Sequence, residues 1–98
     1  MRNRLIWRRS MIDHVFDVML EGGHSCANVG CGIEKGKKWM TIYIIDTDPK
    51  HRRQGEATRL IDTLKAYCQK GDVELAAWCP MNDAAEKLFE KMKVKVYA

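Results

Sequence analysis

The sequence predicts a single α/β (α+β) domain with a mixed central sheet and flanking helices. The chain has 98 residues, and a chain of this length buries roughly 60 to 70% of its unfolded surface, which supports one core. Apolar residues make up 46% of the chain and are spread along it, which excludes extended disorder. Their spacing changes between a period of two and a period of 3.6, so strands and helices are expected to follow one another.

Charge and hydropathy limit the classes of partner. Seventeen Lys and Arg against thirteen Asp and Glu give a net charge of +4, which would suit nucleic acid, an acidic protein surface or a phosphorylated cofactor. Trp7, Trp39 and Trp78 lie in apolar patterns, so we interpret them as core residues and do not expect nucleic-acid binding. The apolar run at 42–45 is far shorter than the roughly 20 residues of a membrane span. No apolar stretch of signal-peptide length follows Met1, and we expect a cytoplasmic protein without a membrane partner.

The cysteines are expected to be free thiols. Cys26, Cys31, Cys68 and Cys79 permit three disulfide pairings, but nothing in the sequence indicates an oxidising compartment. A zinc site built from His24, Cys26 and Cys31 is disfavoured, because the two cysteines would point to opposite faces of a strand. We therefore predict no metal.

The first half of the chain predicts a strand, a helix and a hairpin. Alternating residues at 4–8 indicate a short strand, and an i, i+4 apolar stripe predicts a helix over 11–20, preceded by a serine N-cap and ended by two glycines. Strands over 25–33 and 38–46 are joined by a turn at 34–37. The second strand of this hairpin is apolar on both faces, which predicts a central strand covered on both sides. One of those faces carries Met40, Ile42 and Ile44.

The second half predicts two more helices, each followed by a strand. The first helix has the apolar stripe Ala57, Leu60, Ile61, Leu64 and Cys68, and Gly71 ends it. A strand over 73–79 follows and stops at Pro80. Asn82 or Asp83 can cap the last helix, and a short strand at 94–96 closes the chain. The stripe of this last helix is Ala85, Leu88, Phe89 and Met92.

The loop between the central strand and the next helix predicts an anion site. Basic residues precede Gly55, and the helix begins directly after it. The first amides of a helix have no partner within the helix, the helix dipole is positive there, and a glycine lets the backbone approach a ligand closely. Lys50, Arg52 and Arg53 add long-range attraction for a phosphate.

This loop resembles the acetyl-CoA-binding segment of the GNAT N-acetyltransferases. The family signature, R/Q-x-x-G-x-G/A after a strand and an acidic-proline turn, is met by Arg52-x-x-Gly55-x-Ala57 after Asp48-Pro49. A second family pattern, N-x-x-A-x-x-L-Y/F-x-K, follows the next strand. It is met by Asn82, Ala85, Leu88, Phe89 and Lys91. Together the two motifs cover about half of the chain, and they imply that residues 1–98 form one GNAT-like domain with the acyl-CoA N-acyltransferase fold.

The resemblance also implies where acetyl-CoA, the expected cofactor, would bind. The backbone of Ile45, Asp46 and Thr47 would pair with the pantetheine arm. Asn82 and Phe89 would line the far wall near the thioester. The pyrophosphate would be held by the loop and the first helical turn, at Arg52, Arg53, Gln54, Gly55, Glu56, Ala57 and Thr58.

The catalytic positions depart from the family pattern. Thr41 stands where many members have a glutamate base, and Phe89 stands where many have a tyrosine acid. An amine of pKa about 10.4 must lose a proton before it attacks, so another acceptor or a water chain is needed. The nearby candidates are Tyr43, Asp46 and Cys79, with His24 as a further one.

Two more departures concern the edges of the site. Glu56 is a carboxylate beside the expected pyrophosphate, so we expect it to face solvent or to pair with Arg59 or Arg53. The family's closing Gly-Phe is replaced by Lys93-Val94, and we do not expect the hairpin that follows it in longer relatives. The acceptor pocket is therefore expected to be shallow, or to be completed by a second subunit in a homodimer.

The sequence thus favours an acetyl-CoA-dependent N-acetyltransferase whose acceptor is a protein lysine or N-terminus. Compact members of the family include some encoded by phages that modify a host protein, and this origin fits the chain. The alternative is a catalytically silent GNAT-like module that binds a protein partner and inhibits or bridges it. Thr41 and Phe89 motivate that alternative.

Overall fold

A computed structural model describes residues 3–52, 54–78 and 82–97, which form one six-stranded sheet and two α-helices. The strands follow the order of the sequence across the sheet, from β1 at one edge to β6 at the other. In chain order the elements are β1 (Leu5–Arg9), β2 (Val15–Leu20), β3 (Ser25–Glu34), β4 (Lys37–Thr47), the 3-10 turn η1 (Pro49–His51), α1 (Glu56–Lys70), β5 (Val73–Trp78), α2 (Asp83–Lys91) and β6 (Lys95–Tyr97).

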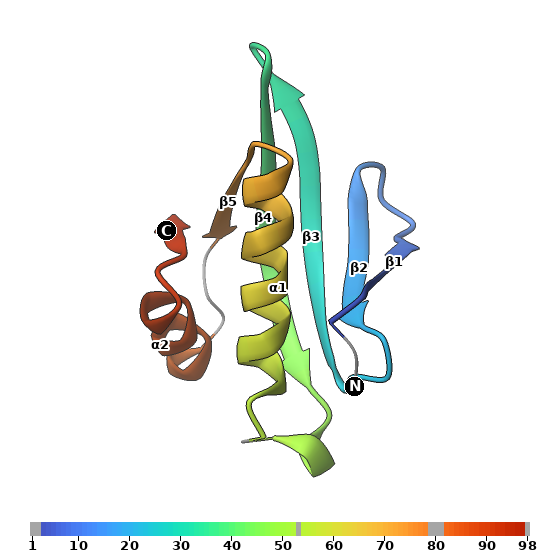
Figure 1. Cartoon of the computed structure of the whole chain (residues 1–98), viewed down its shortest axis with the longest axis vertical. Coiled ribbons are helices and arrows are strands. Elements are labelled where there is room, and N and C mark those ends of the chain that lie inside the picture. Colours follow the sequence, from blue (N-terminus) through green and yellow to red (C-terminus); the bar gives the residue numbers. More distant parts are fainter. Residues whose placement is uncertain (1–2, 53, 79–81, 98) are drawn as a thin grey trace.

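The sheet is mixed, as the sequence predicted. β1 to β4 form an antiparallel meander, while β5 pairs in parallel with β4, and β6 in parallel with β5. Each parallel step needs a crossover, and α1 and α2 provide the two crossovers. Figure 1 shows α1 standing against the sheet, with α2 at the height of the lower half of β4.

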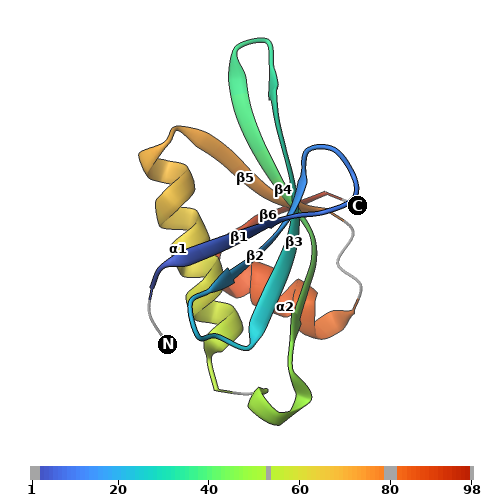
Figure 2. The same cartoon turned by 90° about the vertical axis from the view of Figure 1, so that its right-hand side faces the viewer.

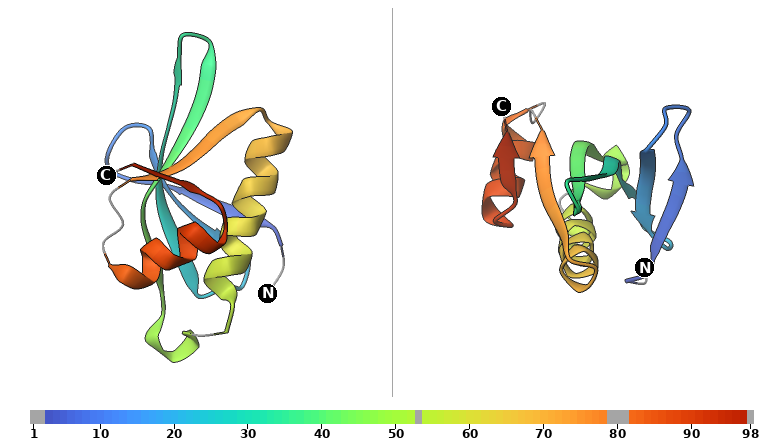
Figure 3. Two further views of the ribbon diagram at one scale, coloured as in Figure 1. Left: turned by 90° about the vertical axis from the view of Figure 1, so that its left-hand side faces the viewer. Right: turned by 90° about the horizontal axis from the view of Figure 1, so that it is seen from above.

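The core lies between the sheet and α1. Leu60, Ile61 and Leu64 of α1 are fully buried, and they pack with buried residues of β2 to β5 and with Phe89 of α2. Gly71 ends α1, and its N–H donates to the carbonyl of Tyr67. α1 stands to one side of the strands in Figure 2 and in the left panel of Figure 3. Neither described helix is long and apolar enough to cross a membrane.

The helix predicted over 11–20 is wrong: residues 15–20 form strand β2, which pairs with both β1 and β3. His14 has a positive φ of 64°, which interrupts any helix at that point. The apolar residues fit a period of two as well as a period of four, and Val18 and Leu20 are buried on one face of the sheet. Pairing on both sides satisfies the backbone of β2, so tertiary structure overrides the helical spacing.

The prediction that both faces of the central strand are covered is also wrong. β4 does lie between β3 and β5, and Met40 and Ile42 face α1. Asn28 of β3, however, pairs with Ile44 while Val29 pairs with Ile42, so one residue of β4 is extra. This β-bulge reverses the alternation beyond it, and Ile44 is 46% exposed on the face away from α1.

The remaining elements are confirmed, with the first and last strands shifted by one residue. The predicted end of the strand over 73–79, at Cys79 and Pro80, lies outside the described residues. Lys35 and Gly36, both with positive φ, connect β3 to β4 in a two-residue hairpin. α1 and α2 have their predicted stripes turned inward, and Asn82 caps α2 by accepting from the N–H of Ala85. Of the three tryptophans expected in the core, Trp7 packs against it, whereas Trp39 is half-buried on the other face of the sheet and Trp78 is 50% exposed.

Candidate functional site

Strand β4 separates from β5 halfway along its length. The two strands pair only as far as Ile42 and Ala77, and β4 then continues to Thr47. Among the described residues, no strand pairs with residues 43–47 of β4 on the β5 side. The bulge at Tyr43 lies where the pairing stops, and bulges bend and twist a strand locally. The backbone groups that face outward along residues 43–46 are therefore available to an extended ligand. Those of Thr47 are engaged, because its N–H donates to Asp46 and its C=O accepts from Arg52.

A channel runs along this free edge of β4. Two neighbouring cavities of about 290 and 360 Å³ share Ile45, Asp46, Asn82 and Ala85 in their walls. The first reaches Tyr43 and Phe89, and the second reaches Thr47, Arg52, Ala57, Ala84 and Leu88. We call the pair the cofactor channel. It leads from the point where β4 leaves β5 to the beginning of α1.

The beginning of α1 is open at Gly55. This residue is the N-cap of α1 with a φ of +76°, and no side chain caps the helix. A Cβ built on Gly55 would have no atom within 4 Å, so the space before the helix is open. Arg52 lines the cofactor channel together with Ala57 of the first helical turn, and one of its guanidinium nitrogens lies 3.7 Å from a carboxylate oxygen of Asp46. Free helix amides, open space and a nearby guanidinium are together suited to a phosphate group.

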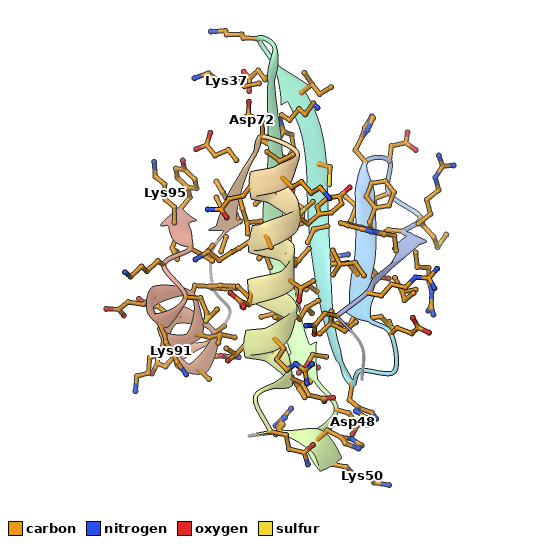
Figure 4. The ribbon with its side chains drawn as sticks, in the orientation of Figure 1. Lys37, Asp48, Lys50, Asp72, Lys91 and Lys95 are labelled. Carbon is orange, nitrogen blue, oxygen red and sulfur yellow. The ribbon has the colours of Figure 1, made fainter. Side chains whose placement is uncertain are left out.

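Glu56 is buried, which corrects the expectation that it faces solvent. Arg53, one of the two arginines expected to pair with it, lies outside the described residues. The two carboxylate oxygens of Glu56 lie 3.0 and 3.2 Å from Nδ1 of His24, in the turn between β2 and β3. The ring of His24 stacks on His51 with centroids 3.4 Å apart. Arg59 instead donates to the side chain of Asn3. The carboxylate of Glu56 is therefore bonded within the fold, and this contact joins the β2–β3 turn to the start of α1. Figure 4 labels Asp48 and Lys50 in the adjoining loop.

A larger cavity opens on the face of the sheet away from α1. We call it the far-face cavity; it measures about 620 Å³. Two glycines of β3 leave space for two aromatic side chains of the cavity wall. A Cβ at Gly30 would lie 2.6 Å from the hydroxyl of Tyr43, and one at Gly32 would lie 2.5 Å from the ring of Trp39. Aromatic residues can therefore lie against β3 only because glycine stands there. The lining is Glu34, Lys35, Lys37, Trp39, Met40, Thr41, Tyr43, Glu74, Ala76, Trp78 and Tyr97.

Most residues predicted to bind the cofactor lie together. Ile45, Asp46, Thr47, Arg52, Ala57, Asn82 and Phe89 line the cofactor channel. Gln54, Gly55, Glu56 and Thr58 belong to the start of α1. Arg53 lies outside the described residues.

The candidates for proton transfer are separated by the fold. Tyr43 lines both the cofactor channel and the far-face cavity. Asp46 has a side chain 76% exposed, and its carboxylate accepts from the N–H of Thr47 and lies near Arg52. His24 is held at the start of α1 by Glu56. Cys79 lies outside the described residues.

Sequence reasoning missed the outer wall of the far-face cavity. Trp78, Tyr97 and Glu74 were not among the candidate residues, and Trp78 was assigned to the core. The signal was the alternation of Trp39, Thr41 and Tyr43 opposite the glycines of β3, which marks a face lined by rings.

The described cysteines are structural. Cys26, Cys31 and Cys68 are free, and burial raises the pKa of each thiol, that of Cys68 to about 11. Burial is the main cause at Cys68, and the nearby Cys31 adds to it. Within the described ranges, no three His, Cys, Asp or Glu side chains gather into a metal-binding group.

Comparison with known proteins agrees with this geometry. The acetyltransferase (GNAT) family matches residues 4–93. The fold is similar to that of a ribosomal-protein-alanine N-acetyltransferase from Brucella melitensis biovar Abortus 2308, with a TM-score of 0.71, 19% identity, and coverage of 90% of this chain and 67% of that one. No curated protein sequence matches the chain.

Two further solved structures share the fold. An aminoglycoside N-acetyltransferase in complex with CoA has a TM-score of 0.60 and 19% identity, with 83% of this chain and 68% of that chain covered. A protein from Pyrococcus furiosus named as a putative acetyltransferase has a TM-score of 0.63 and 16% identity. The match covers 86% of this chain and 60% of that one. The chain thus spans about two thirds of these chains or less. Because the family match extends over nearly the whole chain and includes both the free edge of β4 and the start of α1, the chain belongs to the GNAT family of acetyl-CoA-dependent N-acetyltransferases.

Proposed function

We propose that this protein transfers the acetyl group of acetyl-CoA to a primary amine of a protein, either a lysine side chain or an N-terminus. The observation that carries the proposal is the cofactor channel, which joins a free strand edge to an open helix N-terminus. The acceptor would be a cytoplasmic protein, and a host protein if a phage encodes the chain. The similarity to an enzyme named for a ribosomal-protein alanine supports a protein acceptor.

The residues of the channel fit acetyl-CoA from end to end. At Gly55, the open space in front of α1 would take the pyrophosphate, where any side chain would intrude. The backbone of Ile45 and Asp46 offers hydrogen bonds to an amide-containing arm lying along β4. The apolar wall of Ala85 and Phe89 would close the channel at its inner end. A solved structure of the same fold contains CoA, which agrees with this assignment.

Acetyl-CoA supplies an activated thioester carbonyl, and the chain supplies position and proton transfer. Tyr43 is the candidate that borders both cavities, and its hydroxyl lies over Gly30 on the side of β3, so we assign this hydroxyl to hydrogen-bond the incoming amine in the far-face cavity. Thr41 and Glu74 line the far-face cavity, where water can accept the proton that the amine loses. Asp46 is turned toward Arg52 and the phosphate end, so we assign it to cofactor binding.

The proposal is tested by incubating the purified protein with isotopically labelled acetyl-CoA and a cell lysate. Mass spectrometry should then find the labelled acetyl group on a protein amine. Tyr43→Phe should keep cofactor affinity and lower the rate of transfer, because only the hydroxyl is removed. Acetylation of small metabolites alone would contradict the protein acceptor.

A second candidate function is a binding module without turnover. The observation that favours it is that Thr41 faces the far-face cavity without a carboxylate at its position. Such a module would bind its partner equally well with CoA and with acetyl-CoA, and no partner would gain mass. Comparing partner affinity in the presence of the two cofactors separates the two functions.

A further inference from the structure

The far-face cavity meets the cofactor channel at Tyr43. This residue lines both spaces, at the point where β4 leaves β5. An amine held in the far-face cavity would therefore approach the inner end of the channel. The lining of the cavity extends along β4 from Lys37 to Tyr43, about 20 Å at roughly 3.3 Å per strand residue. An acceptor that fills this length is longer than a single amino acid.

The end of the cavity near the channel is aromatic. Tyr43, Trp78 and Tyr97 provide the rings, while Thr41 and Ala76 are small. Aromatic walls bury an alkyl chain well, and their faces attract an ammonium group. One ring already holds such a group, because Nζ of Lys95 lies 4.9 Å from the ring centroid of Tyr97. Figure 4 labels Lys95 on β6, beside this part of the sheet.

The end near the β3–β4 hairpin is charged but balanced. Glu34 and Glu74 contribute two carboxylates, and Lys35 and Lys37 contribute two ammonium groups. A polycationic amine would gain little net attraction from this lining. A polypeptide, which carries a neutral backbone and side chains of either sign, meets no net repulsion there.

We propose that the far-face cavity is the acceptor site and that it takes a lysine side chain within a polypeptide. This inference rests on the proposed acetyl transfer and chooses between its two kinds of acceptor. The four methylenes of lysine lie between the rings of Trp78 and Tyr97, with the nitrogen next to Tyr43. An α-amino group has no such stem and leaves the rings unfilled. In the reaction the amine nitrogen bonds to the acetyl carbon and the carbon–sulfur bond breaks; of the two protons that the ammonium loses, one goes to sulfur and one to water.

Selectivity for lysine can be measured with matched acceptors and the full chain. One peptide has a blocked N-terminus and a single lysine, a second has ornithine in place of lysine, and a third has a free N-terminus with norleucine in place of lysine. Spermidine serves as the polycationic amine. We expect kcat/KM for the lysine peptide to exceed the other three by about tenfold or more, because only lysine combines the full stem with a single charge.

Variants locate the site. Trp78→Ala should raise KM for the lysine peptide about tenfold and leave acetyl-CoA affinity unchanged, whereas Trp78→Phe should retain most of the affinity for the peptide. Tyr67→Ala is the matched control, because Tyr67 is an equally exposed aromatic residue on α1, outside both cavities. Tyr67→Ala should change neither the KM for the lysine peptide nor the affinity for acetyl-CoA.

A binding measurement makes the test independent of turnover. The indole N–H resonances of Trp7, Trp39 and Trp78 are followed by NMR during titration with the acetyl-lysine peptide. We expect Trp39 and Trp78 to shift and Trp7 to stay. These shifts without acetylation of any amine would overturn acetyl transfer and leave the lysine site in place. Preferred acetylation of the N-terminus or of spermidine would overturn the lysine site alone, and so would acetylation together with unmoved Trp39 and Trp78 resonances. If no resonance shifts and no amine is acetylated, both proposals are overturned.

Discussion

The ring of Tyr43 lies across the backbone of Gly30 on the neighbouring strand. A Cβ on Gly30 would fall 2.6 Å from the phenolic oxygen and 2.7 Å from the ring carbon Cε2. The glycine of β3 thereby sets the position of a side chain of β4 that borders both the cofactor channel and the far-face cavity. The bulge in β4 and Gly30 of β3 together fix the position of Tyr43 at the proposed reaction centre.

Gly30→Ala should displace this ring. Overpacking of this kind costs about 1–3 kcal/mol, so we expect urea denaturation to show a free energy of unfolding lower by that amount. Adding Tyr43→Ala should restore part of the loss, because the clash then has no partner. Gly71→Ala is the control, since the atoms nearest its Cβ are 3.6 Å away. Additive effects of Gly30→Ala and Tyr43→Ala would show that the two residues are not coupled.

Gly55→Asp should abolish most acetyl-CoA binding. Its carboxylate would enter the open space before α1, where a phosphate is expected. Because the φ of +76° strains any non-glycine residue, Gly55→Ala is the matched control for backbone strain. Titration calorimetry should show at least about a tenfold greater loss of affinity for Asp than for Ala. Equal losses would mean that backbone strain alone weakens binding.

The pair of His24 and Glu56 should stabilise the fold modestly. The carboxylate is buried but the histidine side chain is 40% exposed, so solvent screening reduces their interaction. A double-mutant cycle with His24→Ala and Glu56→Gln should give a coupling energy of about 0.5–1 kcal/mol in thermal or urea unfolding. Asp62→Asn, on the exposed side of α1, is the control. A coupling energy of zero would show that the contact between His24 and Glu56 does not contribute to the free energy of unfolding.

Cys68 should make stability depend on pH in the alkaline range. Burial raises the pKa of this thiol from 9.0 to about 11, so the folded state holds the proton more tightly than the unfolded state. The resulting contribution to stability is complete below pH 9 and is lost as the pH rises toward 11. The wild type should therefore lose more unfolding free energy over this interval than Cys68→Ala does. Parallel curves for the two proteins would contradict the raised pKa.

Phe89 should act through packing and not as an acid. It is buried and lines the inner end of the cofactor channel. Phe89→Leu should weaken acetyl-CoA binding, because the smaller side chain leaves part of the wall unfilled. Phe89→Tyr should leave the transfer rate unchanged or raise it, measured as release of the CoA thiol. A sharp loss of rate in Phe89→Tyr at normal cofactor affinity would contradict this role.

The sequence alone determined the elements whose signals are local. Gly55 and Gly71 bracket the periodic stripe of α1, Asn82 begins α2, and Lys35-Gly36 makes the hairpin turn. Each of these residues acts on its own backbone or on the next turn, so neighbouring residues suffice to predict it. The two cofactor motifs are similarly local, and they led to the family that the match over residues 4–93 shows.

Only the tertiary structure determined the secondary structure of segments with ambiguous periodicity and the contacts between strands that are distant in the sequence. Residues 15–20 fit both a helix and a strand, and pairing with β1 and β3 made them a strand. The bulge at Tyr43 depends on the register between β3 and β4, so the exposure of Ile44 could not be read from β4 alone. The burial of Glu56 needed His24, which lies 32 positions away along the chain. Contacts of this kind have no local signature, because their free energy is gained only when the chain has closed the intervening loop.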